Sequence, residues 1–199
     1  MADVVSVLTE CKAMLTGHFL LSSGKHSSQY FQCARLLQYP DRAAAVIGDV
    51  ADRIRLEIAE GRLEADAVIG PAMGGIVVAY ELGRQLGLPA FFTERNDEGI
   101  MTLRRGFEIK PGERIIIAED VVTTGKSTME TAVQIRAMGG EVVGSICIVD
   151  RRPEDAADPF SWPLFAALRQ PAVLWEAEEC ELCREGKTPA VKPGSRKIF

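Results

Sequence analysis

The stretch Ile115-Ile116-Ile117-Ala118-Glu119-Asp120-Val121-Val122-Thr123-Thr124-Gly125-Lys126-Ser127 decides the fold of this chain. Its first four residues are apolar, which predicts a short strand buried on both faces, as in a parallel sheet. Two adjacent carboxylates, Glu119 and Asp120, follow at the carboxyl end of that strand, where open α/β sheets bind their ligands. Residues 123–127 are mostly small or carry hydroxyl groups, so the loop can wrap an anion with backbone N–H groups.

A helix is expected from Thr128 onward, and its N-terminus would face the same anion. Carboxylates beside an anion cradle suit a sugar phosphate, because the acids accept hydrogen bonds from hydroxyl groups while the loop holds the phosphate. Gly125-Lys126-Ser127 imitates the end of a P-loop, but that motif needs a glycine five residues earlier, where Asp120 stands. The remaining alternative is a buried strand followed by an ordinary loop.

The thirteen residues resemble the motif that binds 5-phosphoribosyl-1-diphosphate (PRPP) in type I phosphoribosyltransferases: four apolar residues, two acids, then a loop rich in threonine and glycine. The resemblance implies an α/β fold with a mostly parallel sheet flanked by helices. It also implies a small hood made by the N-terminal segment and the C-terminal tail. The residues implied to bind PRPP here are Glu119, Asp120, Val121, Val122, Thr123, Thr124, Gly125, Lys126 and Ser127.

The composition fits a single globular domain of 199 residues, with 47% hydrophobic and 26% charged residues. The net charge of −5 argues against a broad nucleic-acid-binding surface. No run of 18 apolar residues is present, so we expect no membrane-spanning helix. The N-terminus does not have the pattern of a secretory signal, and the five cysteines suggest reduced thiols. These features predict a cytoplasmic protein.

Three parts make up the expected domain: a hood segment at 1–40, an α/β core at 41–150 and an appendage at 151–199. An amphipathic helix is expected at 3–16. Within the core, strands and helices alternate from residue 65 to 150, which predicts a parallel sheet with helices on both faces. The expected helices lie at 41–60, 76–86 and 127–138, and the expected strands at 67–69, 90–93, 115–118 and 142–149.

Gly70-Pro71-Ala72-Met73-Gly74-Gly75 follows a strand and precedes a helix, and its small residues let a phosphate approach the backbone. A tight strand-to-helix turn is the alternative reading. Beside the 115–127 motif, the segment resembles the family's pyrophosphate loop, which implies PRPP contacts from Ala72, Met73, Gly74 and Gly75. The resemblance also implies a strained, cis peptide between Ala72 and Met73.

Residues 94–110 form a long connection that carries Arg95, Arg104 and Arg105. Long loops in compact domains are often functional. The resemblance implies that this loop closes over PRPP and reaches into the site of a partner subunit, so a homodimer is expected. A solvated hairpin with scattered charge is the alternative.

The segment 17–31 is similar to that of the orotate phosphoribosyltransferases, with a turn at Ser23-Gly24 and an aromatic pair, Tyr30 and Phe31. The resemblance implies that the pair lines the base pocket, that Arg151 meets the orotate carboxylate, and that Thr123 also contacts orotate. A guanidinium suits a planar carboxylate. The alternatives are an aromatic pair buried in the core and, for Arg151, an ordinary surface ion pair.

Three positions depart from the commoner family pattern and indicate a branch with a shorter loop. Ser22 and Gly74 stand where lysines are usual, and the 94–110 loop has no histidine. Two other functions stay open: a phosphoribosyltransferase for a purine or uracil, and a non-catalytic regulator that senses PRPP.

The activity implied is transfer of ribose 5-phosphate from PRPP to orotate, which gives orotidine 5′-phosphate and pyrophosphate in pyrimidine synthesis. Catalytic roles are implied for Glu119, Asp120, Arg95 and Arg104, with Arg105 adding charge at the pyrophosphate. Mg²⁺ would be held mainly through PRPP and Asp120.

Cys180-Glu181-Leu182-Cys183 is a lone CxxC. A structural zinc site needs about four ligands. The only histidines, His18 and His26, are far away in sequence, so reduced thiols are favoured over a metal site. The role of these two cysteines stays open.

Overall fold

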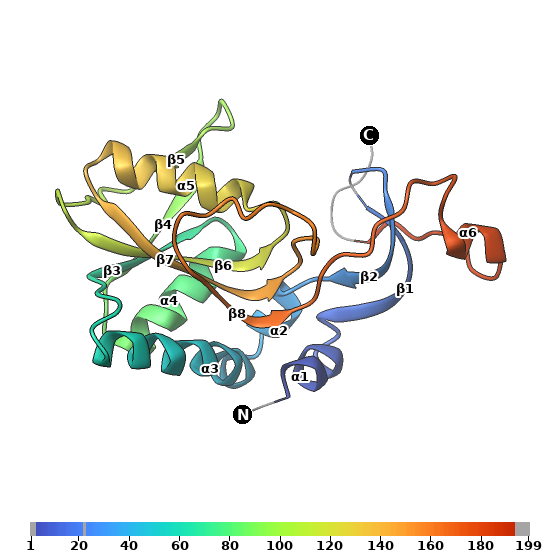
Figure 1. Ribbon diagram of the computed structural model, residues 1–199, viewed down its shortest axis with the longest axis horizontal. Helices are drawn as coiled ribbons and strands as arrows, with labels where there is room; N and C mark the ends of the chain where they lie inside the picture. Colours follow the sequence, from blue (N-terminus) through green and yellow to red (C-terminus); the bar gives the residue numbers. More distant parts are fainter. Residues whose placement is uncertain (1–2, 22, 194–199) are drawn as a thin grey trace.

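The computed structural model describes residues 3–21 and 23–193 (Figure 1). Ser22, one of the departures from the family pattern, lies outside the described residues. The helices are α1 (Val4–Glu10), α2 (Ala34–Leu37), α3 (Pro40–Ala59), α4 (Gly74–Leu86), α5 (Lys126–Ala137) and α6 (Glu181–Glu185). The strands are β1 (Met14–Leu20), β2 (His26–Phe31), β3 (Ala67–Pro71), β4 (Ala90–Arg95), β5 (Met101–Leu103), β6 (Arg114–Val122), β7 (Glu141–Asp150) and β8 (Leu164–Arg169).

The central sheet has the strand order β5-β4-β3-β6-β7-β8. All neighbouring strands pair in parallel except β5, which runs antiparallel to β4 at one edge. Strand β6, which contains the predicted run Ile115–Ala118, lies in the interior between β3 and β7. The predicted fold class, a mostly parallel sheet flanked by helices, is confirmed.

Side chains of β6 alternate between two hydrophobic cores, as the period of a strand requires. Ile116 and Ala118 pack into the core under α3 and α4, and Ile115 and Ile117 pack into the core under α5. Figure 1 shows α3 and α4 on one side of the sheet and α5 on the other. This double coverage explains why the strand is apolar on both faces.

Two expectations about element boundaries were wrong. The N-terminal helix ends at Glu10 and not near residue 16, because Lys12 has a positive φ of 54° and the chain then enters β1. The core does not stop at residue 150: β8 in the tail pairs in parallel with β7 and extends the sheet. The prolines and glycines around β8 hid this strand.

The hood is the antiparallel hairpin β1–β2, with the tail lying along it. Isolated bridges join Phe19 to Val191 and His26 to Trp175. In Figure 1 this hairpin lies beyond the carboxyl ends of β6 and β7, as predicted. The N-terminal segment and the tail therefore meet over the edge of the sheet where ligands bind in open α/β folds.

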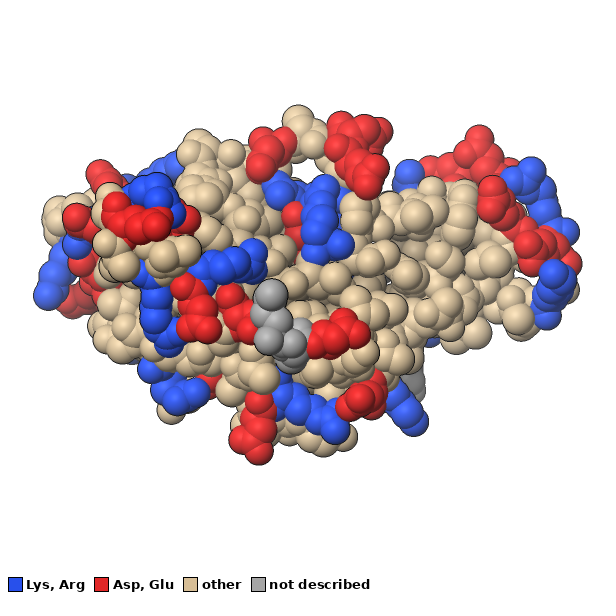
Figure 2. Space-filling view, turned by 60° about the horizontal axis from the view of Figure 1, so that its bottom comes forward, with Lys and Arg blue, Asp and Glu red and all other residues tan. Residues whose placement is uncertain are grey.

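None of the helices in the described part of the chain is long and apolar enough to cross a membrane. On the face shown in Figure 2, acidic and basic side chains are interspersed and do not form one broad basic area. That pattern agrees with the net charge of −5.

Candidate active site

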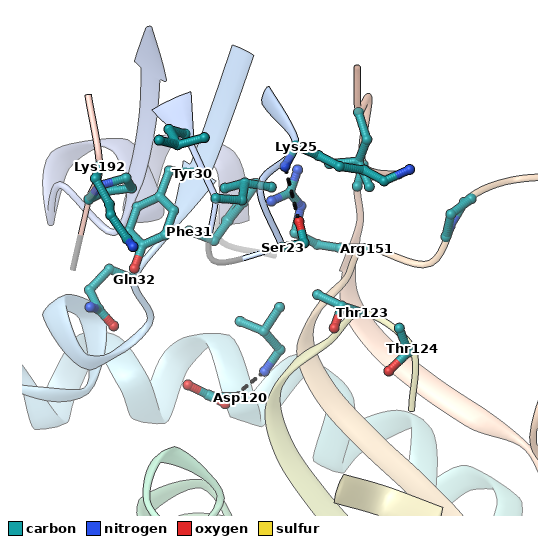
Figure 3. A pocket seen from close by; sticks show the side chains of 17 residues that line it. Ser23, Lys25, Tyr30, Phe31, Gln32, Asp120, Thr123, Thr124, Arg151 and Lys192 are labelled. Carbon is teal, nitrogen blue, oxygen red and sulfur yellow. Dashed lines mark hydrogen bonds between the residues drawn. The ribbon is translucent and has the colours of Figure 1, made fainter. Parts of the chain in front are cut away.

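A cavity of about 630 Å³ lies between the hood and the carboxyl ends of β6 and β7 (Figure 3). It brings together predicted site residues from three separate segments of the chain. They are Tyr30, Phe31, Asp120, Val121, Thr123, Thr124 and Arg151. Phe31 also belongs to the core under α3 and α4. The alternative interpretation, an aromatic side chain buried in the core, therefore applies to Phe31 as well.

A second cavity, of about 430 Å³, is formed by the loop between β6 and α5. Gly125 has a φ of 75°, and an added Cβ there would lie 2.8 Å from the ring of Phe160, so only glycine fits this turn. Thr128 lines the cavity, and its buried hydroxyl has no hydrogen-bond partner among the described residues. The start of α5 adds further N–H groups, so the loop suits an anion such as a phosphate.

The Gly70–Gly75 segment packs directly against the end of β6. The predicted cis peptide between Ala72 and Met73 is present. A Cβ built on Gly74 would lie 2.3 Å from Asp120 Oδ2, and one on Gly75 would lie 2.8 Å from the carbonyl oxygen of Ala118. The absence of a lysine at position 74 has a physical reason, because a side chain there would overlap the Asp120 carboxylate.

Replacing Gly74 with alanine is therefore expected to push Asp120 out of place. We expect catalytic efficiency to fall by about tenfold to 100-fold, since small misplacements in an active site are costly. Gly144→Ala is the matched control, because its added Cβ would meet nothing closer than 3.5 Å. Steady-state kinetics of both variants checks this, and equal efficiencies would contradict the close packing of Gly74 on Asp120.

Of the two adjacent acids, Glu119 is buried and Asp120 is half-buried. Glu119 is 8% exposed, and burial, together with the neighbouring Asp120, raises its pKa to about 8. Burial also raises the pKa of Asp120, against the lowering effect of hydrogen bonds such as the one Oδ1 accepts from the Val121 N–H at 2.9 Å. Asp120 lines the larger cavity and Glu119 the smaller one. Carboxylates held in this way favour hydroxyl donors or a cation.

The raised pKa of Glu119 predicts a stability that depends on pH. Between about pH 4.5 and pH 8 the folded protein binds a proton at Glu119 that the unfolded chain releases. The free energy of unfolding should therefore fall as pH rises through this window and level off above pH 8. The slope from this group is at most about 1.4 kcal/mol per pH unit.

Denaturant unfolding of the wild type and of Glu119→Gln, without Mg²⁺ or PRPP, checks this prediction. The difference between the two free energies should change with pH only in that window. A difference that is constant from pH 5 to pH 8 would mean that Glu119 is ionised at its usual pKa.

Arg151 has an unusual environment for a guanidinium. It is 6% exposed, its Cζ lies 4.8 Å from the ring centroid of Phe31, and burial lowers its pKa. Its Nε and Nη2 are buried and have no hydrogen-bond partner among the described residues. Asp150 does not pair with it: this carboxylate binds Arg152 at 3.0 Å and Arg169 at 2.5 Å. The alternative of an ordinary surface ion pair for Arg151 is therefore wrong, because the side chain is buried.

The expected long loop at 94–110 is partly a β-hairpin, because β4 continues to Arg95 and pairs with β5. Its arginines are engaged within their own chain: Arg95 binds Glu130 at 2.5 Å, and Arg105 binds Glu94 at 2.8 Å. Arg104 lies 4.0 Å from the same Glu94. None of the three lines either cavity. The structure thus leaves these arginines outside the site formed by one subunit.

Sequence reasoning missed three polar residues that line the larger cavity, Lys25, Gln32 and Lys192 (Figure 3). Lys25 follows the Ser23-Gly24 turn, which is a signal that could have identified it. It also forms an ion pair with Glu176 at 2.8 Å. Lys192 comes from the tail, and no motif marks it.

Comparisons with known proteins agree with this geometry. The phosphoribosyl transferase domain family matches residues 36–168. A curated orotate phosphoribosyltransferase from Heliobacterium modesticaldum (strain ATCC 51547 / Ice1) is 48% identical over 194 residues, which cover 98% of this chain and 97% of that protein.

Two solved structures have a similar fold. The orotate phosphoribosyltransferase from Aeropyrum pernix has a TM-score of 0.65 and 28% identity, with 83% of this chain and 93% of that chain covered. The UMP synthase of Leishmania donovani has a TM-score of 0.68 and 24% identity, with 84% of this chain covered. The chain spans only 36% of that longer protein, and at this identity the likeness shows the fold alone.

Proposed function

The chain belongs to the phosphoribosyltransferase family, and we propose on that premise that it is an orotate phosphoribosyltransferase. It transfers the ribose 5-phosphate group of PRPP to orotate in pyrimidine synthesis, and releases pyrophosphate. The 48% identity to a curated enzyme of that name, over almost the whole of both chains, supports this activity.

Arg151 is the observation that carries the choice of base. Orotate differs from uracil by one carboxylate, and a buried guanidinium with unpaired N–H groups is a natural partner for such a group. The side chain lies in the cavity that also contains Asp120 and Thr123 of the PRPP motif. A purine has no carboxylate, and for a purine the buried charge would stay without a partner.

The mechanism follows from where these groups lie. The 5′-phosphate of PRPP binds in the 123–128 loop, and Asp120 and Glu119 accept hydrogen bonds from the ribose hydroxyls. This places the anomeric carbon in the larger cavity, facing the base held by Arg151. N1 of orotate then attacks as pyrophosphate leaves, with positive charge growing on the ribose. Catalysis comes mostly from positioning and from the negative charge of Asp120.

Mg²⁺ is the cofactor that the family implies, and the donors present fit it. The adjacent carboxylates of the buried Glu119 and the half-buried Asp120 offer hard oxygen ligands, and their raised pKa values are consistent with a site that has no cation nearby to stabilise the ionised form. When bound, Mg²⁺ neutralises the pyrophosphate that leaves. Asp120 would hold it together with the oxygens of PRPP, while Glu119 keeps the ribose in place.

A base panel tests the proposed function. Purified enzyme is given PRPP and Mg²⁺ with orotate, uracil, adenine or hypoxanthine, and release of pyrophosphate is followed. We expect turnover with orotate at least about 100 times more efficient than with the other bases, as a site built around a charged group requires. Preference for a purine would overturn the choice of base, and binding of PRPP without turnover of any base would indicate a regulator.

The active unit in this proposal is a homodimer with the 94–110 segment acting across the interface. An exposed apolar stripe on α4 supports an interface: Met73, Val77 and Tyr80 are 81%, 44% and 69% exposed. Their spacing places them on one face of the helix. Arg104 and Arg105 would leave their surface partner Glu94 to meet pyrophosphate in the partner's site, since such exposed ion pairs are weak.

Complementation between two inactive chains tests the exchange. One chain carries Asp120→Asn, and the other carries Arg104→Ala with Arg105→Ala. After equal mixing and subunit exchange, about half of the dimers are hybrids with one intact site, so about one quarter of wild-type activity should return. Mass labels on the two chains would show whether subunits have exchanged. If they have exchanged and no activity returns, the arginines act in the site of their own subunit or have no catalytic role.

We also place the enzyme in the cytoplasm. All five cysteines are free, as is usual in a reducing compartment. PRPP, one of its two proposed substrates, is a phosphorylated metabolite.

A further inference from the structure

Four side chains with metal-binding atoms meet between the hood hairpin and the tail, outside the candidate active site. His18 and His26 come from β1 and β2, and Cys180 and Cys183 come from the start of α6. Their ligand atoms all lie within 4.8 Å of one another. The sequence separation of the histidines from the CxxC had argued against a metal, but the fold brings the two pairs together.

The distances match a tetrahedral site. Zn–S bonds of about 2.3 Å and Zn–N bonds of about 2.05 Å place neighbouring sulfur and nitrogen ligands about 3.6 Å apart. Three of the four sulfur–nitrogen pairs lie at 3.4 Å (Cys180 Sγ to His18 Nε2), 3.6 Å (Cys183 Sγ to His18 Nε2) and 3.3 Å (Cys183 Sγ to His26 Nδ1). The two nitrogens, at 2.8 Å, would separate by about 0.5 Å around a metal.

The surroundings of the cluster hold these ligands in place. His18 Nδ1 lies 2.9 Å from the carbonyl oxygen of Thr188, so this nitrogen donates its proton there and leaves Nε2 free as a ligand. His18, His26 and Cys180 are 5%, 7% and 0% exposed. Burial keeps water away from three of the four ligands, and the exposed Cys183 leaves a path for an ion to enter.

We propose that His18, His26, Cys180 and Cys183 form a structural zinc site that fastens the C-terminal tail to the N-terminal hairpin. Two thiolates and two neutral imidazoles complete a tetrahedral shell with no open position, as in structural zinc sites and unlike catalytic ones. Sulfur ligands exclude the hard ions Mg²⁺ and Ca²⁺. The two thiolates balance the charge of the ion, so the buried site carries no net charge.

The proposed zinc site lies next to the part of the tail that forms one wall of the active-site cavity. Backbone hydrogen bonds join His26 to Trp175 and His18 to Val191, on either side of the cluster. The next residues along the tail, Leu174 and Lys192, line the cavity. Zinc would therefore hold this wall in place. Its effect on orotate binding rests on the proposed function, whereas the zinc content does not.

The test is metal analysis of the full chain, purified under reducing conditions without a chelator. We expect about one zinc ion per wild-type chain and less than about 0.1 per chain in Cys180→Ser/Cys183→Ser. Cys11→Ser is the matched control: Cys11 is also buried but lies outside the cluster, so this variant should keep its zinc. A chelator should lower the melting temperature of the wild type and of Cys11→Ser but not of the double variant.

Cobalt binding keeps the test decisive if the double variant does not fold. Wild-type protein stripped of metal and given Co²⁺ should show the intense visible absorption of a tetrahedral site with sulfur ligands. The KM for orotate should rise on stripping and recover with zinc. Three results would each overturn the site. The wild-type protein could contain no zinc and take up no equivalent of Co²⁺, or it could contain a Cys180–Cys183 disulfide in place of the metal. The third result is a folded double variant that retains zinc.

Discussion

Replacing Arg151 with methionine is expected to lower the catalytic efficiency for orotate by about 100-fold to 1,000-fold, since each hydrogen bond to a charged group contributes about 1.5–3 kcal/mol. The loss should appear mainly in the KM for orotate, with the KM for PRPP unchanged. Activity with uracil, which has no carboxylate, should stay at its low wild-type level. The preference for orotate over uracil should therefore almost disappear.

The same substitution should not destabilise the protein. In the free enzyme, Nε and Nη2 of the buried guanidinium have no hydrogen-bond partner among the described residues, and an apolar side chain of similar length avoids that cost. We therefore expect a melting temperature equal to or above that of the wild type. Arg136→Met is the matched control, because Arg136 also stacks on an aromatic ring, that of Trp162 at 5.2 Å, but does not line the cavity. Unchanged orotate kinetics in Arg151→Met would refute the assigned role.

Replacing Asp120 with asparagine is expected to reduce kcat by about 100-fold to 1,000-fold, the usual cost of removing one electrostatic contact from a transition state. Asparagine has the same shape and can still accept the hydrogen bond from the Val121 N–H. The negative charge that stabilises the developing positive charge on the ribose is lost. Since burial already raises the pKa of Asp120, the variant should be at least as stable as the wild type.

Asp52→Asn is the isosteric control for this experiment. Its carboxylate is 75% exposed on α3 and pairs with Arg55, away from both cavities. This variant should keep full activity. If Asp120→Asn keeps both its turnover and its affinity for PRPP, the two adjacent acids are not part of the catalytic site.

The sequence could predict the elements whose signals are local. The apolar run before Glu119 marked the interior strand, because a strand covered by helices on both faces has to be apolar throughout. The glycines of the 70–75 segment and Gly125 marked the two tight loops, where an added Cβ would meet the backbone or neighbouring side chains. These signals were sufficient for the fold and for the position of the two tight loops, while their contacts with PRPP stay a prediction.

Features formed by contacts between the two ends of the chain were beyond the reach of sequence reasoning. Strand β8 depends on pairing with β7, and Lys192 reaches the cavity only because the tail lies along β1. His18 and Cys180 are 162 residues apart in sequence but 3.4 Å apart in space. The arginines of the 94–110 segment show a related limit: within one subunit they pair with Glu94 and Glu130, so a role for them at the site stays a prediction that depends on a second subunit.

A crystal structure with orotate and an unreactive PRPP analogue tests the account most directly. We predict the orotate carboxylate within hydrogen-bond distance of the Arg151 guanidinium, and the 5′-phosphate of the analogue on the backbone N–H groups of residues 124–127. Asp120 should lie against the ribose hydroxyls. An orotate carboxylate that faces solvent, with Arg151 still unpaired, or a 5′-phosphate bound elsewhere would contradict the assignment of the site.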